Sequence, residues 1–162
     1  WKQGNVNVDA RYEGHRDALR AAGIPYQSRL VRIHEPIEGS RDPIADAGYA
    51  AMRRWLQEGF DATAVLAYND PMAVGIIRAL REAGVRVPED VSVTGYDGTP
   101  GFDYFHPRLT TIRVPLSDIG RAGLELLIRK IQGEAGVPSL LKLPVKLIPG
   151  ESTAVSNKCD KK

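Results

Sequence analysis

The sequence has a single cysteine among its 162 residues, which limits both its covalent chemistry and its metal chemistry. Cys159 lies in the polar run from Ser156 to Lys162, so a disulfide framework and a cluster of thiolate metal ligands are excluded. The lack of disulfides favours a reducing compartment. No run of about 18 consecutive apolar residues occurs, and the N-terminus lacks a charged-then-apolar signal pattern. We therefore expect no membrane-spanning segment.

The chain also lacks a marked excess of charge of either sign. The 22 Lys and Arg residues are nearly balanced by 20 Asp and Glu residues, which gives a net charge of +2 with the signs interleaved along the sequence. Domains that bind nucleic acid usually concentrate basic residues in a stripe or patch. The balance therefore disfavours binding of DNA or RNA by this chain itself.

Signatures of catalysis and of nucleotide cofactors are missing as well. His15, His34 and His106 are far apart in the sequence, and none has a second histidine four residues on or a GxSxG neighbour. Neither GxGxxG nor GxxxxGK[ST] occurs. We therefore predict no catalytic residue, no metal site and no cofactor.

Hydrophobic residues are present at 43%, and the length is close to one average domain of about 150 residues. Periodic apolar segments alternate with short stretches rich in the turn-forming residues Gly, Pro and Asp. The 3.6-residue period predicts helices over Asp9–Ala22, from Pro43 to Gly59, from Pro71 to Gly84, and from Ser117, as its N-cap, to Gly133. Short apolar or alternating runs predict strands over Leu30–Ile33, Ala64–Ala67, Val91–Tyr96, Leu109–Val114 and Leu141–Ile148.

The alternation of strands and helices predicts the α/β class. Each crossover must return over one face, so we expect a parallel sheet flanked by helices on both faces. The continuous apolar run Ala64–Ala67 predicts a strand that is covered on both sides. The chain opens on Trp1 and its first element is a helix with no preceding strand, so we expect further sequence upstream.

Polar residues follow two of the predicted strands, at the edge where an open parallel sheet usually binds its ligand. For Asp70 we predict an N-cap, because Pro71 follows it. Asn69 and Asp97 fit ordinary turns, but they also fit a binding site. An amide that donates and accepts, beside a carboxylate with two acceptor oxygens, suits a polyhydroxylated molecule such as a sugar.

Arg11 and several aromatic residues are further candidates for this site. Arg11 falls in the first turn of the first predicted helix, where the helix dipole disfavours a cation. It is either an exposed surface residue or a ligand contact. Tyr68, Tyr96 and Phe102 lie in the same loops, where they either pack in the core or line the site and stack on a sugar ring.

Several motifs occur in a fixed order between Arg11 and Thr153: ARYEGHRDALRAAGI, AVLAYNDPMAVGIIRALREAG, VRVPEDVSVTGYDG and PRLTTIRVPLSDIGRAGLELLIRKIQG. In this order they resemble the C-terminal half of the regulatory domain in the LacI/GalR family of bacterial transcription repressors. The resemblance implies one lobe of a two-lobed, periplasmic-binding-protein-like (type I) fold, with a small effector in the cleft. It also implies a cytoplasmic homodimer that binds operator DNA through an upstream helix-turn-helix.

The resemblance further assigns segments and residues. Residues 1–150 would form the C-terminal lobe with the strand that crosses to the other lobe, and residues 151–162 the end of the last strand and a polar tail. The N-terminal lobe and the helix-turn-helix would lie outside this chain. By motif position, Arg11, Asn69 and Asp97 would contact the effector, whereas Val74 and Phe105 would lie in the dimer interface.

The favoured hypothesis is therefore a domain that senses a sugar or related metabolite and controls operator binding allosterically. One alternative is the solute receptor of a sugar importer, which shares the two-lobed architecture. Another is an enzyme that uses Asp70 and Asp97 as an acid–base pair, or a domain phosphorylated on Asp97.

Overall fold

The computed structural model describes residues 6–34 and 36–155, and Cys159 with the rest of the polar tail lies outside the described residues. The α/β class predicted from the sequence is confirmed. The elements are, in chain order, α1 (Val6–Ala21), α2 (Pro43–Gln57), β1 (Ala64–Leu66), α3 (Asp70–Glu82), β2 (Ser92–Thr94), β3 (Thr111–Arg113), α4 (Leu116–Ile131) and β4 (Lys146–Ile148). Short 3-10 turns cover Ser28–Leu30 and Phe102–Tyr104.

The strands form a parallel unit with one antiparallel addition. β1 and β2 pair in parallel, with Val65 opposite Val93. The chain after β2 continues in parallel beside β3 through bridges at Thr94–Thr110 and Asp97–Arg113. β4 then pairs with β3 in the antiparallel direction. The carboxyl ends of β1 and β2 therefore lie at the same edge of the sheet. The predicted site residues Asn69 and Asp97 follow these two strand ends in the sequence.

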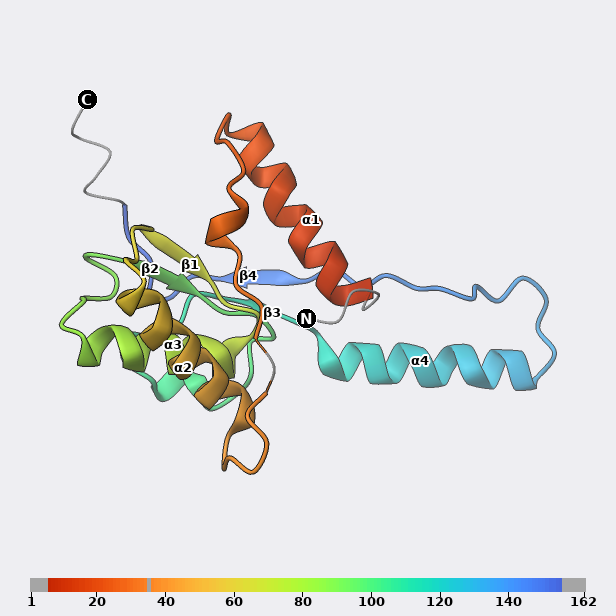
Figure 1. Ribbon diagram of the computed structural model, residues 1–162. Helices are drawn as coiled ribbons and strands as arrows, with labels where there is room; N and C mark the ends of the chain where they lie inside the picture. Colours follow the sequence, from red (N-terminus) through yellow and green to blue (C-terminus); the bar gives the residue numbers. More distant parts are fainter. Residues whose placement is uncertain (1–5, 35, 156–162) are drawn as a thin grey trace.

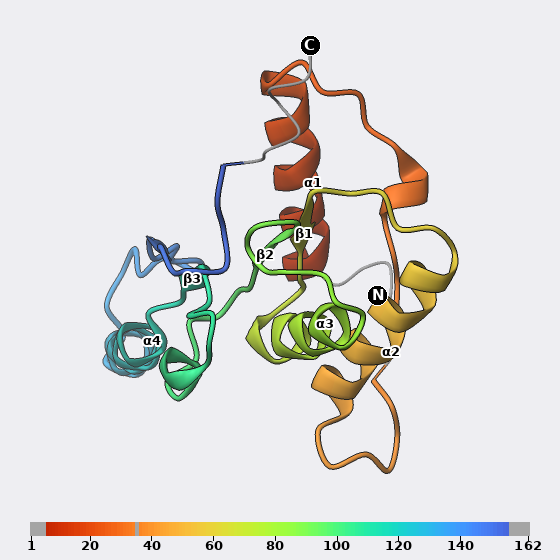
Figure 2. The ribbon, with the colours of Figure 1, turned by 90° about the vertical axis from the view of Figure 1, so that its left-hand side faces the viewer.

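The core lies between the β1–β2 pair and helices α3 and α2, while α1 lies on the opposite side of the pair (Figures 1 and 2). Met52 of α2, Ile77 and Leu80 of α3, and Val93 of β2 are all buried to 1% exposure or less. Glycine lets α2 and α3 approach closely, since a Cβ atom at Gly75 would lie 1.9 Å from a backbone oxygen of α2. This tight helix pair packs beneath the strand ends that carry the site.

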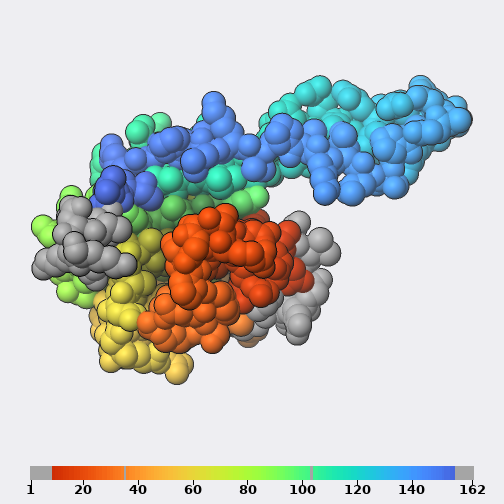
Figure 3. Space-filling view, turned by 90° about the horizontal axis from the view of Figure 1, so that it is seen from above, coloured from red at the N-terminus to blue at the C-terminus, as the bar shows by residue number. Residues whose placement is uncertain are grey.

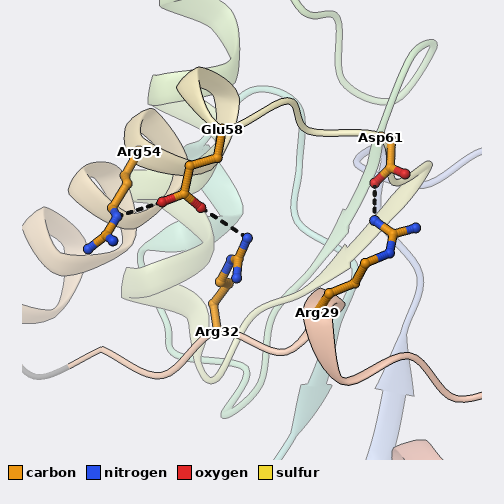
Figure 4. A network of polar contacts seen from close by, with 5 residues as sticks. All are labelled: Arg29, Arg32, Arg54, Glu58 and Asp61. Atoms are coloured by element: carbon orange, nitrogen blue, oxygen red, sulfur yellow. Dashed lines mark hydrogen bonds and ion pairs between the residues drawn. The ribbon is translucent and has the colours of Figure 1, made fainter.

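The predicted strand Leu30–Ile33 is wrong. The segment forms the 3-10 turn Ser28–Leu30 and then runs extended without a strand partner among the described residues. Side chains hold it instead: Arg29 contacts Asp61 at 2.9 Å, and Arg32 contacts Glu58 at 3.1 Å (Figure 4). Ion pairs between exposed side chains are worth only about 0–1 kcal/mol each, so this segment is attached more weakly than a paired strand would be.

The expectation that strand β1 is covered on both faces is also wrong. Val65 is buried, but its neighbour Leu66 is 62% exposed. The physical reason is that side chains alternate between the two faces of a strand: Val65 faces the core with α2 and α3, whereas Leu66 faces the other side, where α1 passes without burying it. A short apolar run fits a half-covered edge strand as well as a fully covered one.

Helix α4 extends from the body as an arm, together with the chain that returns to β4 (Figure 3). It begins at Leu116 after Pro115 and has no side-chain cap, so the predicted N-cap at Ser117 is wrong. Most of its large apolar residues are exposed: Leu116, Ile119, Leu124, Leu127, Ile128 and Ile131. Within the described part of the chain, no helix is both long and apolar enough to span a lipid bilayer.

His34 makes the stability of this body sensitive to pH. Its Nε2 atom is buried and has no hydrogen-bond partner among the described residues. Burial lowers the pKa of His34 below the ordinary value, and the charges of Arg54 and Arg32 lower it further. The unfolded chain therefore binds more protons than the folded chain once the pH falls below about 6.5, so folding stability falls with pH in that range.

We expect His34→Leu to flatten this dependence, because leucine cannot take up the proton. The free energy of unfolding in urea should change less between about pH 5 and 7 in the variant than in the unmodified chain. At pH 8 the histidine is neutral in both folded and unfolded states, so the two proteins should then differ by a constant offset. Equal slopes below neutral pH would show that His34 does not carry the effect.

Candidate functional site

Arg11 and Asp97, which the sequence predicted to share a site, lie side by side in the structure. The Nη2 atom of Arg11 is 3.7 Å from Oδ1 of Asp97. The Nη1 atom of Arg11 donates a hydrogen bond of 2.8 Å to the backbone carbonyl of Tyr68, the residue before Asn69. Helix α1, the end of β1 and the end of β2 therefore contribute to one cluster. α1 begins at Val6, so Arg11 falls beyond its first turn, and these contacts rather than the helix dipole account for the position of Arg11.

Asn69 is the N-cap of α3, a role that the sequence assigned to Asp70. Its Oδ1 accepts a hydrogen bond of 3.1 Å from the backbone N–H of Met72, and its backbone is extended. The predicted cap is therefore off by one residue, because Asp70 already has helical geometry. Both residue types favour caps, so composition did not separate them. The amide nitrogen of Asn69 makes no hydrogen bond with a described residue in the structure.

Asp70 is buried to 1% exposure and ties three segments together. Its Oδ2 accepts the backbone N–H of Thr99 at 2.8 Å, and its Oδ1 accepts the hydroxyl of Thr111 at 2.5 Å. The absence of a side chain at Gly95 makes room for it, since a Cβ there would lie 2.3 Å from Oδ1. With both oxygens committed to structural bonds, Asp70 is a poor member of the acid–base pair considered above.

The backbone of Asp97 is held in a strained conformation. Its φ of 98° is in the left-handed region, which non-glycine residues rarely adopt. Its carbonyl accepts the N–H of Val114 at 3.1 Å, which fixes it against the strand beside it. The next residue must be glycine, because a Cβ at Gly98 would lie 2.6 Å from Cα of Arg113. Such strain is typical of functional sites, where the surrounding structure holds a side chain in a required direction.

The carboxylate of Asp97 is half-buried, yet it accepts no hydrogen bond from the described residues. Burial raises the pKa of Asp97; the charge of Arg11 partly offsets this rise, and the charge of Asp70 adds to it. A half-buried carboxylate with unused acceptor sites and a shifted pKa is a candidate ligand contact.

The aromatic candidates divide into two groups. The guanidinium carbon of Arg11 lies 3.7 Å from the ring centroid of Tyr96 and 4.9 Å from that of Tyr68, so a cation already faces both rings. Phe102 is half-buried in its 3-10 turn, and its role as lining stays a prediction.

Val74 and Phe105, the predicted interface residues, line one shallow groove beside α3, together with Tyr49, Arg78 and Glu82. Arg11, Asn69 and Asp97 are not part of that lining. The groove mixes apolar and charged side chains, which is a composition that protein interfaces commonly have. The structure thus brings Val74 and Phe105 to one surface, apart from the Arg11–Asp97 cluster, and their role in a dimer stays a prediction.

This chain is similar to known proteins over almost its whole length. A family model described as a periplasmic binding protein-like domain matches residues 2–153. The HTH-type transcriptional regulator CelR of Thermobifida fusca is 39% identical over 142 residues, which cover 88% of this chain and 40% of that regulator. This chain therefore spans well under half the length of that relative.

Solved structures agree with this match. The CelR–cellobiose complex superposes with a TM-score of 0.81 at 38% identity, over 93% of this chain and 44% of that one. A LacI family regulator from Enterococcus faecium with bound ribose has a TM-score of 0.76 at 34% identity, over 91% of this chain and 52% of that one. At 38% and 34% identity, these matches indicate a common family as well as a common fold.

Proposed function

We propose that this chain, which belongs to the LacI family of transcriptional regulators, senses a small hydroxyl-rich effector and thereby controls operator binding. Its membership of the family follows from the periplasmic binding protein-like domain and from the similarity to CelR. The proposal rests on Arg11 and Asp97, whose charged groups lie 3.7 Å apart at the carboxyl edge of the sheet. The Asp97 carboxylate accepts no hydrogen bond from the described residues, so its oxygens are available to a ligand.

The chemistry of the pair favours a sugar or a related polyol. Asp97 accepts hydrogen bonds from hydroxyl groups, and the free N–H groups of Arg11 donate to hydroxyl oxygens. Asn69 adds an amide donor from the start of α3. Cellobiose and ribose, which are bound in the structures of two relatives, both present neighbouring hydroxyls of this kind.

Sensing requires no bond to be made or broken. An effector that binds one arrangement of two lobes more tightly than the other shifts the population toward it, and attached DNA-binding domains respond to that shift. We accordingly propose no enzymatic activity. The relatives are transcriptional regulators, which favours this role over the importer receptor considered from the sequence.

The chain would supply the C-terminal lobe and the crossing strands, with the N-terminal lobe and a helix-turn-helix elsewhere in the regulator. The apolar face of α4 supports this division, because most of its leucines and isoleucines are exposed in this chain, which covers 44% of the chain in the CelR structure. We propose that the N-terminal lobe covers it. Residues 151–155 belong with the C-terminal lobe, since Ser152 is fully buried and its hydroxyl donates to the carbonyl of Val93 at 2.6 Å.

If the N-terminal lobe covers α4, hydrogen exchange of the α4 backbone amides should be slow in the intact regulator. Fast exchange there would contradict the proposal that this lobe covers α4.

We further propose a cytoplasmic homodimer, because a protein that binds an operator must share a compartment with the DNA. In this dimer, Val74 and Phe105, which line the groove beside α3, would contact the same residues of the partner protomer. Val74→Glu should shift the intact regulator from dimer to monomer in sedimentation equilibrium, because a carboxylate would have to lose its hydration at the contact. A variant that stays fully dimeric would exclude this surface.

A sugar panel tests the proposed function. We expect at least one of cellobiose, ribose and lactose to raise the melting temperature of the intact regulator and to change its affinity for operator DNA. Binding of a nonsugar metabolite, with no response to any sugar tested, would contradict the effector class. A sugar that binds without changing operator affinity would contradict the regulatory role.

A further inference from the structure

Arg11 and Asp97 are a half-buried pair of opposite charges that lie close together without a hydrogen bond. At 3.7 Å, the Nη2 and Oδ1 atoms are too far apart for a hydrogen bond, which needs about 2.7–3.2 Å. Charge-assisted bonds of this type are among the strongest in proteins, so the guanidinium would gain by moving closer. Other contacts must therefore hold it in place.

Two tyrosines, Tyr68 and Tyr96, restrain the guanidinium of Arg11. The ring centroid of Tyr96 lies 3.7 Å from its central carbon, well inside the range of about 6 Å for cation–π attraction. The carbonyl of Tyr68 accepts its Nη1 hydrogen at 2.8 Å, and the ring of Tyr68 lies 4.9 Å away. Of the two rings, that of Tyr96 is thus the nearer to the cation.

We propose that Tyr96 is a positioning residue for effector binding: its ring holds the Arg11 guanidinium away from Asp97, so that the carboxylate keeps its acceptor sites for ligand hydroxyls. This inference rests on the proposed function and revises the sequence-based expectation that Tyr96 lines the site as a stacking surface. Removal of the ring frees the guanidinium to bond Asp97 directly. The carboxylate then has to give up that bond before it can accept a hydroxyl.

The arrangement also restricts the class of ligand. The face of the Tyr96 ring that Arg11 covers cannot also stack on a sugar, so on that side recognition depends on hydrogen bonds to Arg11 and Asp97. The charges of Arg11 and Asp97 offset each other, so the pair offers no net charge that would attract an acidic ligand. The geometry therefore suits a neutral, hydroxyl-rich ligand rather than an aromatic or acidic one.

The first test needs no effector. In the NMR spectrum of this chain, the Nε–H resonance of Arg11, identified by its loss in Arg11→Lys, should be shifted upfield by the ring current of Tyr96. The shift should persist in Tyr96→Phe and disappear in Tyr96→Leu. In the leucine variant, the Asp97 carboxyl should also titrate at a lower pH, because Arg11 then contacts it directly. An unshifted Arg11 resonance in the unmodified chain would overturn the proposal, and this measurement holds even if Tyr96→Leu does not fold.

The second test uses the intact regulator and a sugar from the panel that binds it. Tyr96→Leu should weaken binding by about 3- to 30-fold, whereas Tyr96→Phe should stay within about twofold of the unmodified protein. Tyr104→Leu is the matched control, because Tyr104 is 89% exposed in a neighbouring turn. Unchanged affinity in Tyr96→Leu, or an equal loss in Tyr96→Phe, would contradict a role for the ring. If no sugar binds the unmodified regulator, the proposed function fails, while the Arg11 resonance still decides the positioning role.

Discussion

Replacement of Asp97 by alanine should weaken effector binding to the intact regulator by about 10- to 150-fold, because each charge-assisted hydrogen bond contributes about 1.5–3 kcal/mol. The carboxylate is held by a strained backbone and accepts no bond from the described residues, so its acceptor sites are available to a ligand. Isothermal titration calorimetry with a sugar that binds the unmodified protein measures the effect.

Asp17→Ala provides the control, since Asp17 is an exposed carboxylate on α1 that pairs only with Arg20 among the contacts seen in the described chain. It should leave the dissociation constant unchanged. The pH dependence gives an independent check: burial raises the pKa of Asp97, so affinity should begin to fall at a higher pH than an ordinary aspartate would give. Asp97→Asn should remove that dependence. An unchanged dissociation constant in Asp97→Ala would remove Asp97 from the site.

Replacement of Gly75 by alanine should lower the free energy of unfolding by about 3 kcal/mol, which is at the upper end of the usual range for overpacking. The new Cβ would lie 1.9 Å from the backbone oxygen of Ala45, and a backbone atom cannot move aside as a flexible side chain can. Helices α2 and α3 would have to separate, which loosens the contacts of Met52 and Leu80 in the core. Urea unfolding of this chain measures the change.

Gly14→Ala is the matched control for this prediction. Gly14 is also helical, but a Cβ there would meet no atom within 4 Å. Alanine should therefore be neutral or stabilise the chain by up to about 1 kcal/mol, because it lowers the entropy of the unfolded state. If the two variants were equally stable, the close approach of α2 and α3 would not be a determinant of the fold.

The long helices were the most predictable part of the fold. The period of apolar residues and the Pro and Gly signals at the ends placed α2 and α3 to within a few residues. Strand pairing was less predictable, because it depends on which edge is available. The segment Leu30–Ile33 has an apolar character typical of a strand, but it is held by ion pairs of Arg29 and Arg32 instead. The apolar face of α4 was predicted, but its exposure in this chain was not.

The site was predictable in its location and less so in its contacts. The convergence of Asp97 with Arg11 follows from parallel strands whose carboxyl ends meet at one edge, together with the family resemblance. Three features carried no sequence signal: the shift of the cap from Asp70 to Asn69, the backbone carbonyl of Tyr68 as the acceptor for Arg11, and the ring of Tyr96 beneath the guanidinium. Each depends on local backbone geometry or on contacts between distant segments.

The most direct test is a crystal structure of the intact regulator with its sugar bound. We expect sugar hydroxyls within hydrogen-bond distance of the Asp97 carboxylate and of the Arg11 guanidinium, with the Tyr96 ring still facing that guanidinium. A sugar that occupies another part of the protein, with Asp97 and Arg11 free of contact, would contradict it.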